Sequence, residues 1–381
     1  MEPPSEDERW MSLALQLAEQ GQGSVEPNPM VGCVLVRDGQ LIGSGYHQRF
    51  GGPHAEVEAI RSVTDSDTHG ATAYVTLEPC SHYGKTPPCC DALIKARIAR
   101  VVVAMSDPFA KVDGEGIRRL RASGIEVVVG TLSVQAEELN APYLKRLREH
   151  RPWVIAKWAM TADGRIATHE GQSQWISGEA SRRQVHALRS RVDAILVGMG
   201  TVEADDPLLT ARPVDNAGNP IAPKRVATRV IACRNRVPKV THKLIHTADQ
   251  TPTELYVRSS TPSDTLQALQ AAGARVHRCE SSDDNAFIGE MLAQLADREV
   301  TNLMIEGGPE LLGSFLCESP RQCWIDELHV YVGAKLFGGS RAASPLGGLG
   351  FGELASAPRL ELRSVDRFEH DLRLIYRTIL H

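Results

Sequence analysis

Three residues near the N-terminus of this 381-residue chain have the types and spacing of a metal site. His54 is followed by Cys80, which stands after Glu78-Pro79, and then by Cys89. An imidazole and two thiolates are ligands that zinc prefers, and three protein ligands leave a fourth position for water. Zinc lowers the pKa of such a water to about 7. The sequence therefore predicts a zinc site that activates water, held by His54, Cys80 and Cys89.

A carboxylate lies two residues after the histidine. Glu56 could take a proton from the activated water and give it to a departing amine. His-x-Glu followed by Pro-Cys and a further Cys is the signature of zinc deaminases, in which the glutamate lies outside the metal shell. Ordinary core residues or a structural zinc site are the alternatives, but a structural site would use four protein ligands and give Glu56 no role. We predict that Glu56 is the catalytic acid and base of a deaminase acting on a pyrimidine-like ring.

The cysteine spacing departs from the usual deaminase pattern. Eight residues separate Cys80 from Cys89, where two are typical. The intervening loop is rich in polar and cationic side chains and could contact substrate. Cys90 could replace Cys89 by spacing alone. We favour Cys89 and expect Cys90 to turn into the core of the following helix.

The composition indicates two globular domains. The chain is too long for one core, and it contains 42% hydrophobic and 23% charged residues. A net charge of −5 without a basic block argues against a nucleic-acid partner. The acidic N-terminal residues do not resemble a secretory signal, and no apolar stretch is long enough to span a membrane. Eight cysteines are too sparse for a disulfide scaffold. We expect a cytoplasmic protein.

Alternating strands and helices predict that the first domain is α/β, with helices on both faces of a sheet. A hairpin turn is expected at Asp38-Gly39. A basic helix at 140–151 ends at Pro152, and we place the domain boundary there, giving domains 1–147 and 148–381. The helices are expected at 10–19, 54–62, 91–99 and 116–122, and the strands at 32–37, 41–46, 73–77, 100–104 and 125–129.

A second α/β series follows. Two glycine-containing turns after strands, 197–203 and 305–310, could approach a nucleotide closely. The same turns are also ordinary strand-to-helix connections, so the residues alone leave both interpretations open. The strands are expected at 153–159, 194–198, 225–232, 302–306 and 327–332, the helices at 179–190 and 310–317, and a surface loop at 212–224.

The sequence resembles the family of bifunctional riboflavin-biosynthesis deaminase/reductases over essentially the whole chain. The long cysteine spacing is that family's own form. The resemblance implies an N-terminal cytidine-deaminase-like three-layer domain and a C-terminal dihydrofolate-reductase-like α/β domain. The matching segments are Pro27-Asn28-Pro29, Val31-Gly32-Cys33, Gly45-Tyr46-His47, 53–57, 76–82 and 84–90, then 157–165, 173–176, 204–210 and 305–309.

This resemblance implies two consecutive reactions on a small phosphorylated pyrimidine. Hydrolytic deamination of 2,5-diamino-6-ribosylamino-4(3H)-pyrimidinone 5′-phosphate comes first. Reduction of the ribosyl group to ribityl then gives 5-amino-6-ribitylamino-uracil 5′-phosphate. The implied cofactors are Zn²⁺ and NADPH, and the implied assembly is a homo-oligomer, either a dimer or a tetramer.

The resemblance also implies contact residues, carried over position by position. The deaminase substrate would contact Asn28, His47, His82, Lys85 and Thr86. NADPH would contact Ala159, Trp175, Thr201, Asp205 and the turn from Gly308. The reductase substrate would contact Ser173, Arg189, Leu208, Arg212 and Glu306. Arg189 could equally lie on a solvated helix face.

Two positions depart from the family pattern. Phe109 stands where asparagine is usual, so one substrate contact is absent or supplied differently. Cys233 stands where the family often has serine at a cofactor contact.

Two other function classes share part of the pattern. A deaminase of free nucleosides or of tRNA has the same His-Ala-Glu and Pro-Cys elements, but the cysteine spacing, the acidic balance and the second domain argue against it. A non-enzymatic, zinc-stabilised nucleotide-binding or regulatory module would need no acid-base residue at Glu56.

Overall fold

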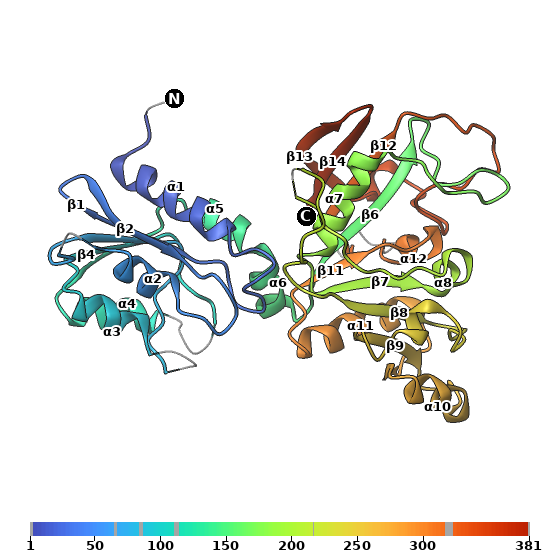
Figure 1. Cartoon of the computed structure of the whole chain (residues 1–381), viewed down its shortest axis with the longest axis horizontal. Coiled ribbons are helices and arrows are strands. Elements are labelled where there is room, and N and C mark those ends of the chain that lie inside the picture. The colour runs from blue at the N-terminus through green and yellow to red at the C-terminus, as the bar shows by residue number, and fades with distance from the viewer. Residues whose placement is uncertain are drawn as a thin grey trace. The chain divides into compact units, whose positions relative to one another are not determined.

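The computed structural model describes residues 3–64, 67–83, 87–109, 114–215, 217–316 and 323–379. Lys85 and Thr86, which are predicted substrate contacts, lie outside the described residues. The chain divides into two compact units, Met1–Glu149 and His150–His381 (Figure 1).

A five-stranded mixed sheet with strand order β2-β1-β3-β4-β5 forms the first unit. Strand β1 pairs antiparallel with β2 and β3, while β3, β4 and β5 run parallel. The hairpin turn predicted between β1 and β2 is confirmed, because Asp38 and Gly39 have φ of 52° and 71°, as a tight two-residue hairpin requires. The strands are β1 (Gly32–Arg37), β2 (Gln40–Tyr46), β3 (Thr72–Val75), β4 (Arg100–Val103) and β5 (Glu126–Val129).

Helices cover both faces of this sheet, which confirms the three-layer prediction (Figure 1). Successive side chains on a strand point to opposite faces. Cys33 and Leu35 of β1 therefore pack with α2, α3 and α4, whereas Val34 and Val36 pack with α1, α5 and α6. The helices are α1 (Glu6–Glu19), α2 (Ala55–Arg61), α3 (Cys89–Lys95), α4 (Glu115–Ala122), α5 (Ser133–Leu139) and α6 (Ala141–Glu149).

Two differences from the predicted boundaries affect the site. Helix α3 begins at Cys89, two residues earlier than expected, so Cys89 lies in its first turn. Strand β3 ends at Val75, where its pairing with β1 and β4 ends, so the segment leading to Cys80 is a loop. Helix α5 was not predicted.

The second unit is built on a nine-stranded sheet with strand order β10-β9-β8-β7-β11-β6-β12-β14-β13. The strands from β10 to β12 run parallel, and the antiparallel pair β13 and β14 completes one edge. The strands are β6 (Trp153–Thr161), β7 (Ala194–Gly198), β8 (Thr228–Cys233), β9 (Thr253–Arg258), β10 (Arg275–Cys279), β11 (Asn302–Ile305), β12 (Glu327–Gly333), β13 (Arg359–Phe368) and β14 (Asp371–Ile379).

Two hydrophobic clusters lie on the two faces of this sheet. Ala194 and Leu196 of β7 pack with α11 and α12, while Ile195 and Val197 pack with α7, α8, α9 and α10. The helices are α7 (Glu179–Arg189), α8 (Met199–Asp205), α9 (Lys243–His246), α10 (Ser263–Ala271), α11 (Asp284–Asp297) and α12 (Pro309–Ser314), with a short 3₁₀ turn η2 (Leu354–Ser356).

Two predicted elements of this unit are shorter than expected. Strand β8 begins at Thr228 rather than at 225, because its pairing with Ala194 of β7 begins there. Helix α12 ends at Ser314, and Cys317 lies outside the described residues.

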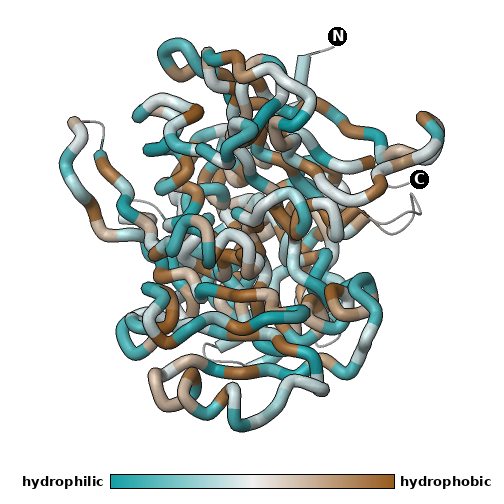
Figure 2. Tube along the Cα trace, turned by 90° about the vertical axis from the view of Figure 1, so that its right-hand side faces the viewer, coloured by the Kyte–Doolittle hydropathy of each residue, from teal (hydrophilic) through white to brown (hydrophobic). Residues whose placement is uncertain are grey.

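No helix of the described residues is long and apolar enough to cross a membrane. Figure 2 shows short hydrophobic stretches interspersed with hydrophilic ones along the trace.

Candidate functional site

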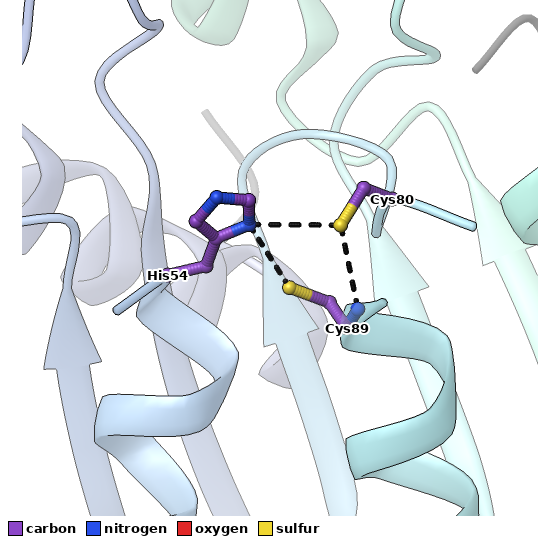
Figure 3. Close-up of side chains that lie close together, drawn as sticks. All are labelled: His54, Cys80 and Cys89. Carbon is purple, nitrogen blue, oxygen red and sulfur yellow. Dashed lines mark hydrogen bonds between the residues drawn. The ribbon is translucent and has the colours of Figure 1, made fainter. Parts of the chain in front are cut away.

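The predicted metal ligands converge from three segments of the first unit (Figure 3). His54 precedes α2, Cys80 follows β3 in a loop, and Cys89 begins α3. Nδ1 of His54 lies 3.1 Å from Sγ of Cys89 and 3.6 Å from Sγ of Cys80. All three candidate ligand atoms lie within 4.8 Å of one another. One ion can therefore contact all three.

The donor set and its surroundings fit zinc. One nitrogen and two sulfurs supply three ligands of a tetrahedral site. The backbone N–H of Cys89 donates to Sγ of Cys80 at 3.3 Å, and hydrogen bonding by Cys89 lowers the pKa of the Cys80 thiol to about 4. A thiolate is the form that binds metal.

Glu56 lies in the first turn of α2, two residues after His54, and its side chain is buried. Its Oε2 atom is buried and has no hydrogen-bond partner among the described residues. Burial raises the pKa of Glu56, although the charge of His54 opposes this shift. A buried polar atom without a partner beside a metal site suits a group that hydrogen-bonds to a metal ligand or to substrate.

Cys90 faces away from the cluster. Its Sγ donates to the carbonyl oxygens of Pro79, at 3.3 Å, and Gly116, at 3.5 Å. Burial raises the pKa of the Cys90 thiol to about 12, so this thiol stays protonated. Cys90 therefore fastens α3 to the Cys80 loop and to α4, while Cys89 joins the cluster.

Glu78 anchors the same loop, a role that sequence reasoning missed. Its buried carboxylate accepts the backbone N–H of Gly114 and of Ile117, each at 3.2 Å, and that of Asp107 at 3.4 Å. The only sequence signal was a glutamate placed directly before Pro-Cys. Three backbone donors around one carboxylate fix the approach of Cys80 to the site.

Asn28 and His47 lie together beside His54. The amide Nδ2 of Asn28 is 3.1 Å from Nε2 of His47, and Nδ1 of His47 donates to the carbonyl of Pro53 at 2.9 Å. The rings of His47 and His54 meet edge to face with centroids 5.4 Å apart. Burial lowers the pKa of His47, which keeps the ring neutral. The structure thus brings two predicted substrate residues next to the metal ligands.

His82 and Phe109 are also neighbours, with ring centroids 6.3 Å apart. Nδ1 of His82 is buried and has no hydrogen-bond partner among the described residues. The backbone N–H of Phe109 donates to the carboxylate of Asp107. The hydroxyl of Tyr143 donates to the same carboxylate at 3.0 Å. Phe109 therefore stands on a fixed turn near His82.

The second unit has a cavity of about 660 Å³ at the carboxyl ends of β7, β8 and β11. Ligands of open parallel sheets bind at such edges. Thr201 and Gly308 come from the two predicted glycine turns, which are joined because the N–H of Gly308 donates to Oγ1 of Thr201 at 3.0 Å. The predicted contacts that line this cavity are Ala159, Ser173, Thr201, Asp205, Glu306 and Gly308.

A second cavity of about 590 Å³ lies between α7 and the segment after α8. It shares Lys157, Ala159, Ser173 and Asp205 with the first cavity, so the two cavities meet there. Its lining includes the predicted substrate residues Ser173, Arg189, Leu208 and Arg212, and also Trp175, which was predicted to contact the cofactor.

A buried charge cluster lies beside this junction. Nη2 of Arg189 donates to Oε2 of Glu306 at 2.9 Å, and Nζ of Lys157 donates to the same oxygen at 3.3 Å. Burial alone would raise the pKa of Glu306, but the charges of Arg189 and Lys157 outweigh burial and lower it to about 2. Only 15% of the Arg189 side chain is exposed, so this arginine does not lie on a solvated helix face. Sequence reasoning assigned no role to Lys157.

Cys233 lines neither cavity. It is 1% exposed and belongs to the hydrophobic cluster under α9 and α10.

Comparison with known proteins matches each of the two units to a protein family. Residues 4–105 match the model of the cytidine and deoxycytidylate deaminase zinc-binding region, and residues 152–374 match that of the RibD C-terminal domain. The chain is 39% identical over 380 residues to the riboflavin biosynthesis protein RibD of Escherichia coli (strain K12), with 97% of this chain and 98% of that protein covered. The chain belongs to the RibD family. It therefore joins a deaminase domain to a reductase domain.

Other members of the RibD family share the whole architecture. RibD of Actinobacillus pleuropneumoniae is 38% identical over 370 residues, covering 96% of this chain and 94% of that protein. The structure of Acinetobacter baumannii RibD, form 1, matches with a TM-score of 0.84 at 36% identity, covering 98% of this chain and 99% of that chain. The Thermotoga maritima diaminohydroxyphosphoribosylaminopyrimidine deaminase/5-amino-6-(5-phosphoribosylamino)uracil reductase matches with a TM-score of 0.80 at 32% identity, with the same coverage. The predicted fold class is confirmed.

Proposed function

We propose that this RibD-family chain catalyses two consecutive steps of riboflavin biosynthesis. The first is deamination of 2,5-diamino-6-ribosylamino-4(3H)-pyrimidinone 5′-phosphate, and the second is NADPH-dependent reduction of the ribosyl group to ribityl. The observation that carries the proposal is the convergence of His54, Cys80 and Cys89 beside the buried Glu56. The named activities of the Thermotoga maritima relative support this substrate.

In the deaminase step, His54, Cys80 and Cys89 would hold Zn²⁺, which supplies Lewis acidity and an activated water when bound. Glu56 would accept a proton from that water and deliver it to the exocyclic amine. Hydrolysis would replace the amine by a carbonyl oxygen and release ammonia. The raised pKa of Glu56 favours this role, because a group that both accepts and donates a proton works best when its pKa is near the working pH.

Asn28, His47 and His82 would position the deaminase substrate. The amide of Asn28 is held by His47, which in turn is held by the carbonyl of Pro53. His82 carries a buried ring nitrogen without a partner among the described residues, which a substrate oxygen or nitrogen could satisfy. Lys85 and Thr86 remain predicted contacts from the family resemblance.

In the reductase step, NADPH would supply hydride to C1′ of the ring-opened sugar when bound. Ala159, Thr201, Asp205 and Gly308 would contact it in the larger cavity, with Trp175 at the neighbouring cavity. Glu306 is ionised and could accept from sugar hydroxyls, while Arg189 and Arg212 would face the phosphate. Ser173 and Leu208 would complete the substrate site.

The family resemblance further supports a cytoplasmic homo-oligomer with domains 1–147 and 148–381. The net charge of −5 agrees with a small-molecule substrate rather than a nucleic acid.

The test supplies zinc-loaded protein with the diaminopyrimidinone phosphate, with and without NADPH. We expect ammonia release in both samples and NADPH oxidation only after deamination. Absence of ammonia in both samples would refute the deaminase assignment. Unchanged NADPH in the presence of deaminated intermediate would refute the reductase assignment.

A further inference from the structure

His186 lines the cavity of about 590 Å³ in the second unit, and the proposed function gives this residue no role. It lies on α7, three residues before Arg189, so the two side chains lie on the same side of the helix. Another part of the cavity wall is formed by the segment after α8, which contains the predicted substrate residues Leu208 and Arg212. His186 and Arg212 therefore face one cavity from two different elements.

Two side chains of α7 hold the backbone of this segment. Nη1 of Arg189 donates to the carbonyl oxygen of Thr210 at 3.3 Å. Nδ1 of His186 accepts the backbone N–H of Arg212, also at 3.3 Å. The segment is thus tied to α7 at two alternate residues, and His186 holds the residue that carries the guanidinium group.

The contact with the backbone fixes which nitrogen of His186 carries the proton. A backbone N–H can only donate, so Nδ1 must be the acceptor, and a neutral imidazole then carries its proton on Nε2. Burial, followed by the charges of Arg189 and Arg212, lowers the pKa of His186 to about 4. Lys157 acts in the same direction, and Glu306 opposes the shift. The ring is therefore neutral at neutral pH, and its Nε2–H is a donor.

This donor lies beside the guanidinium group of Arg212. Nε2 of His186 is 3.5 Å from Nη2 of Arg212, and because both nitrogens carry protons, neither can accept from the other. Among the residues that the structure describes, no carboxylate pairs with Arg212, whereas Arg189 pairs with Glu306. Two donors at this separation can both reach one oxygen placed about 2.9 Å from each nitrogen. The pair therefore suits an anionic oxygen of a ligand in the cavity.

We propose that His186 and Arg212 together bind the 5′-phosphate of the reductase substrate, with Nε2–H of His186 and Nη2–H of Arg212 donating to one phosphate oxygen. His186 then has two tasks, because its Nδ1 positions the backbone of Arg212 while its Nε2 contacts the ligand. Hydrogen bonds to an ionised acceptor are stronger than those between neutral groups, so even a neutral ring contributes to binding. This inference rests on the proposed reductase function.

The test compares the deaminated intermediate with its dephosphorylated form, which lacks only the group that His186 is proposed to bind. Titration calorimetry on the full-length protein gives the Kd of each ligand, and NADPH oxidation gives kcat and KM. The variants are H186L and H186Q. The matched control is Q184L, because Gln184 lies on the same helix and lines neither cavity.

We expect H186L to raise the Kd and the KM for the phosphorylated ligand roughly 10- to 100-fold, because a hydrogen bond to a charged group is lost. The Kd for the dephosphorylated form and the kcat should change by less than about threefold. H186Q should bind the phosphorylated ligand more tightly than H186L, because its amide offers both an acceptor and a donor. Q184L should bind both ligands as the wild type does.

The double variant H186L/R212Q tests whether the two side chains share one oxygen. Its Kd for the phosphorylated ligand should rise by less than the product of the two single effects, because residues with a shared partner are coupled. A rise equal to that product would mean that His186 and Arg212 bind separate groups, and it would overturn the shared contact.

Equal weakening of both ligands in H186L would also overturn the inference, because a purely structural role of His186 does not depend on the phosphate. An unchanged Kd for the phosphorylated ligand in H186L would overturn it as well. Wild-type protein that binds the phosphorylated ligand without oxidising NADPH would refute the reductase function itself, whereas the other outcomes refute only the role of His186.

Discussion

Glu56 combines two properties that are unusual for a carboxylate. It is almost fully buried, and one of its oxygens has no hydrogen-bond partner among the described residues. Both properties follow from its place in the first turn of α2, which starts directly after the ligand His54. The helix therefore sets the distance between metal ligand and acid-base residue.

Replacing Glu56 by glutamine should lower the rate of deamination by about 10²- to 10⁴-fold, because a positioned acid-base residue contributes that much. The shape of the side chain is retained, so bound zinc and the unfolding temperature should change little. Ammonia release and metal analysis would measure the two effects. Glu58→Gln is the matched control, since Glu58 lies on the same helix and accepts from Arg61 at 3.2 Å. Equal activity in the two variants would exclude Glu56 from the mechanism.

Glu306 should make the stability of the second unit depend on pH. Its pKa in the folded protein is lowered to about 2, below the ordinary value of 4.5. A lowered folded pKa gives stability that is fully present above pH 4.5 and is lost as the pH falls toward 2. As the pH falls over this range, the unfolding temperature of the wild type should therefore decrease more steeply than that of Glu306→Gln.

The variant Glu306→Gln should also be less stable at neutral pH. It leaves Arg189 and Lys157 largely buried without their carboxylate, which costs about 3–5 kcal/mol for a broken buried pair. If the stability of the variant and of the wild type depended on pH in the same way, ionised Glu306 would not stabilise the fold through this charge cluster.

At the scale of elements, the metal site depends on how α3, α4 and the Cys80 loop fit together. Cys90 of α3 donates to Pro79 and to Gly116 of α4, while Glu78 accepts from the backbone of α4. A Cβ atom on Gly116 would stand 2.0 Å from the carbonyl oxygen of Pro79. Only glycine permits this close approach.

Gly116→Ala should therefore push α4 away from the Cys80 loop and weaken zinc binding. Overpacking of this kind typically costs about 1–3 kcal/mol. Zinc retention against a chelator would measure the effect, with Glu115→Ala as control because Glu115 is exposed and pairs with Arg118. Wild-type zinc retention in Gly116→Ala would show that α4 does not position Cys80.

At the scale of the whole molecule, the two chemistries use separate parts of the chain. The metal ligands lie between residues 54 and 89, in the first compact unit. The two cavities are lined by residues between 157 and 343, in the second unit. Each unit has its own sheet and its own hydrophobic clusters.

Removing zinc should therefore stop only one of the two reactions. A chelator should abolish ammonia release from the first substrate, while NADPH oxidation should continue at an unchanged rate when the deaminated intermediate is supplied. Restoring zinc should restore ammonia release. Loss of both activities after zinc removal would mean that the second unit needs the metal for its fold or its chemistry.

The amino-acid sequence by itself determined the local chemistry. A histidine, two cysteines and a glutamate at this spacing predict a zinc deaminase, because metal ligands and acid-base groups must be of particular types. Short continuous runs of hydrophobic residues likewise predicted strands such as β1 and β7, nearly all of whose residues are buried.

Only the tertiary structure decided which groups from distant segments meet. The pairing of Arg189 with Glu306, the support of the Cys80 loop by Glu78, and the choice of Cys89 rather than Cys90 for the cluster all depend on contacts between separate elements. The elements α9, β9, α10, β10 and α11 were not predicted, because parallel strands buried on both faces do not alternate and short apolar runs fit either a strand or a buried helix. Packing of the sheet against its helices, rather than local periodicity, brings residues such as Arg189 and Glu306 together.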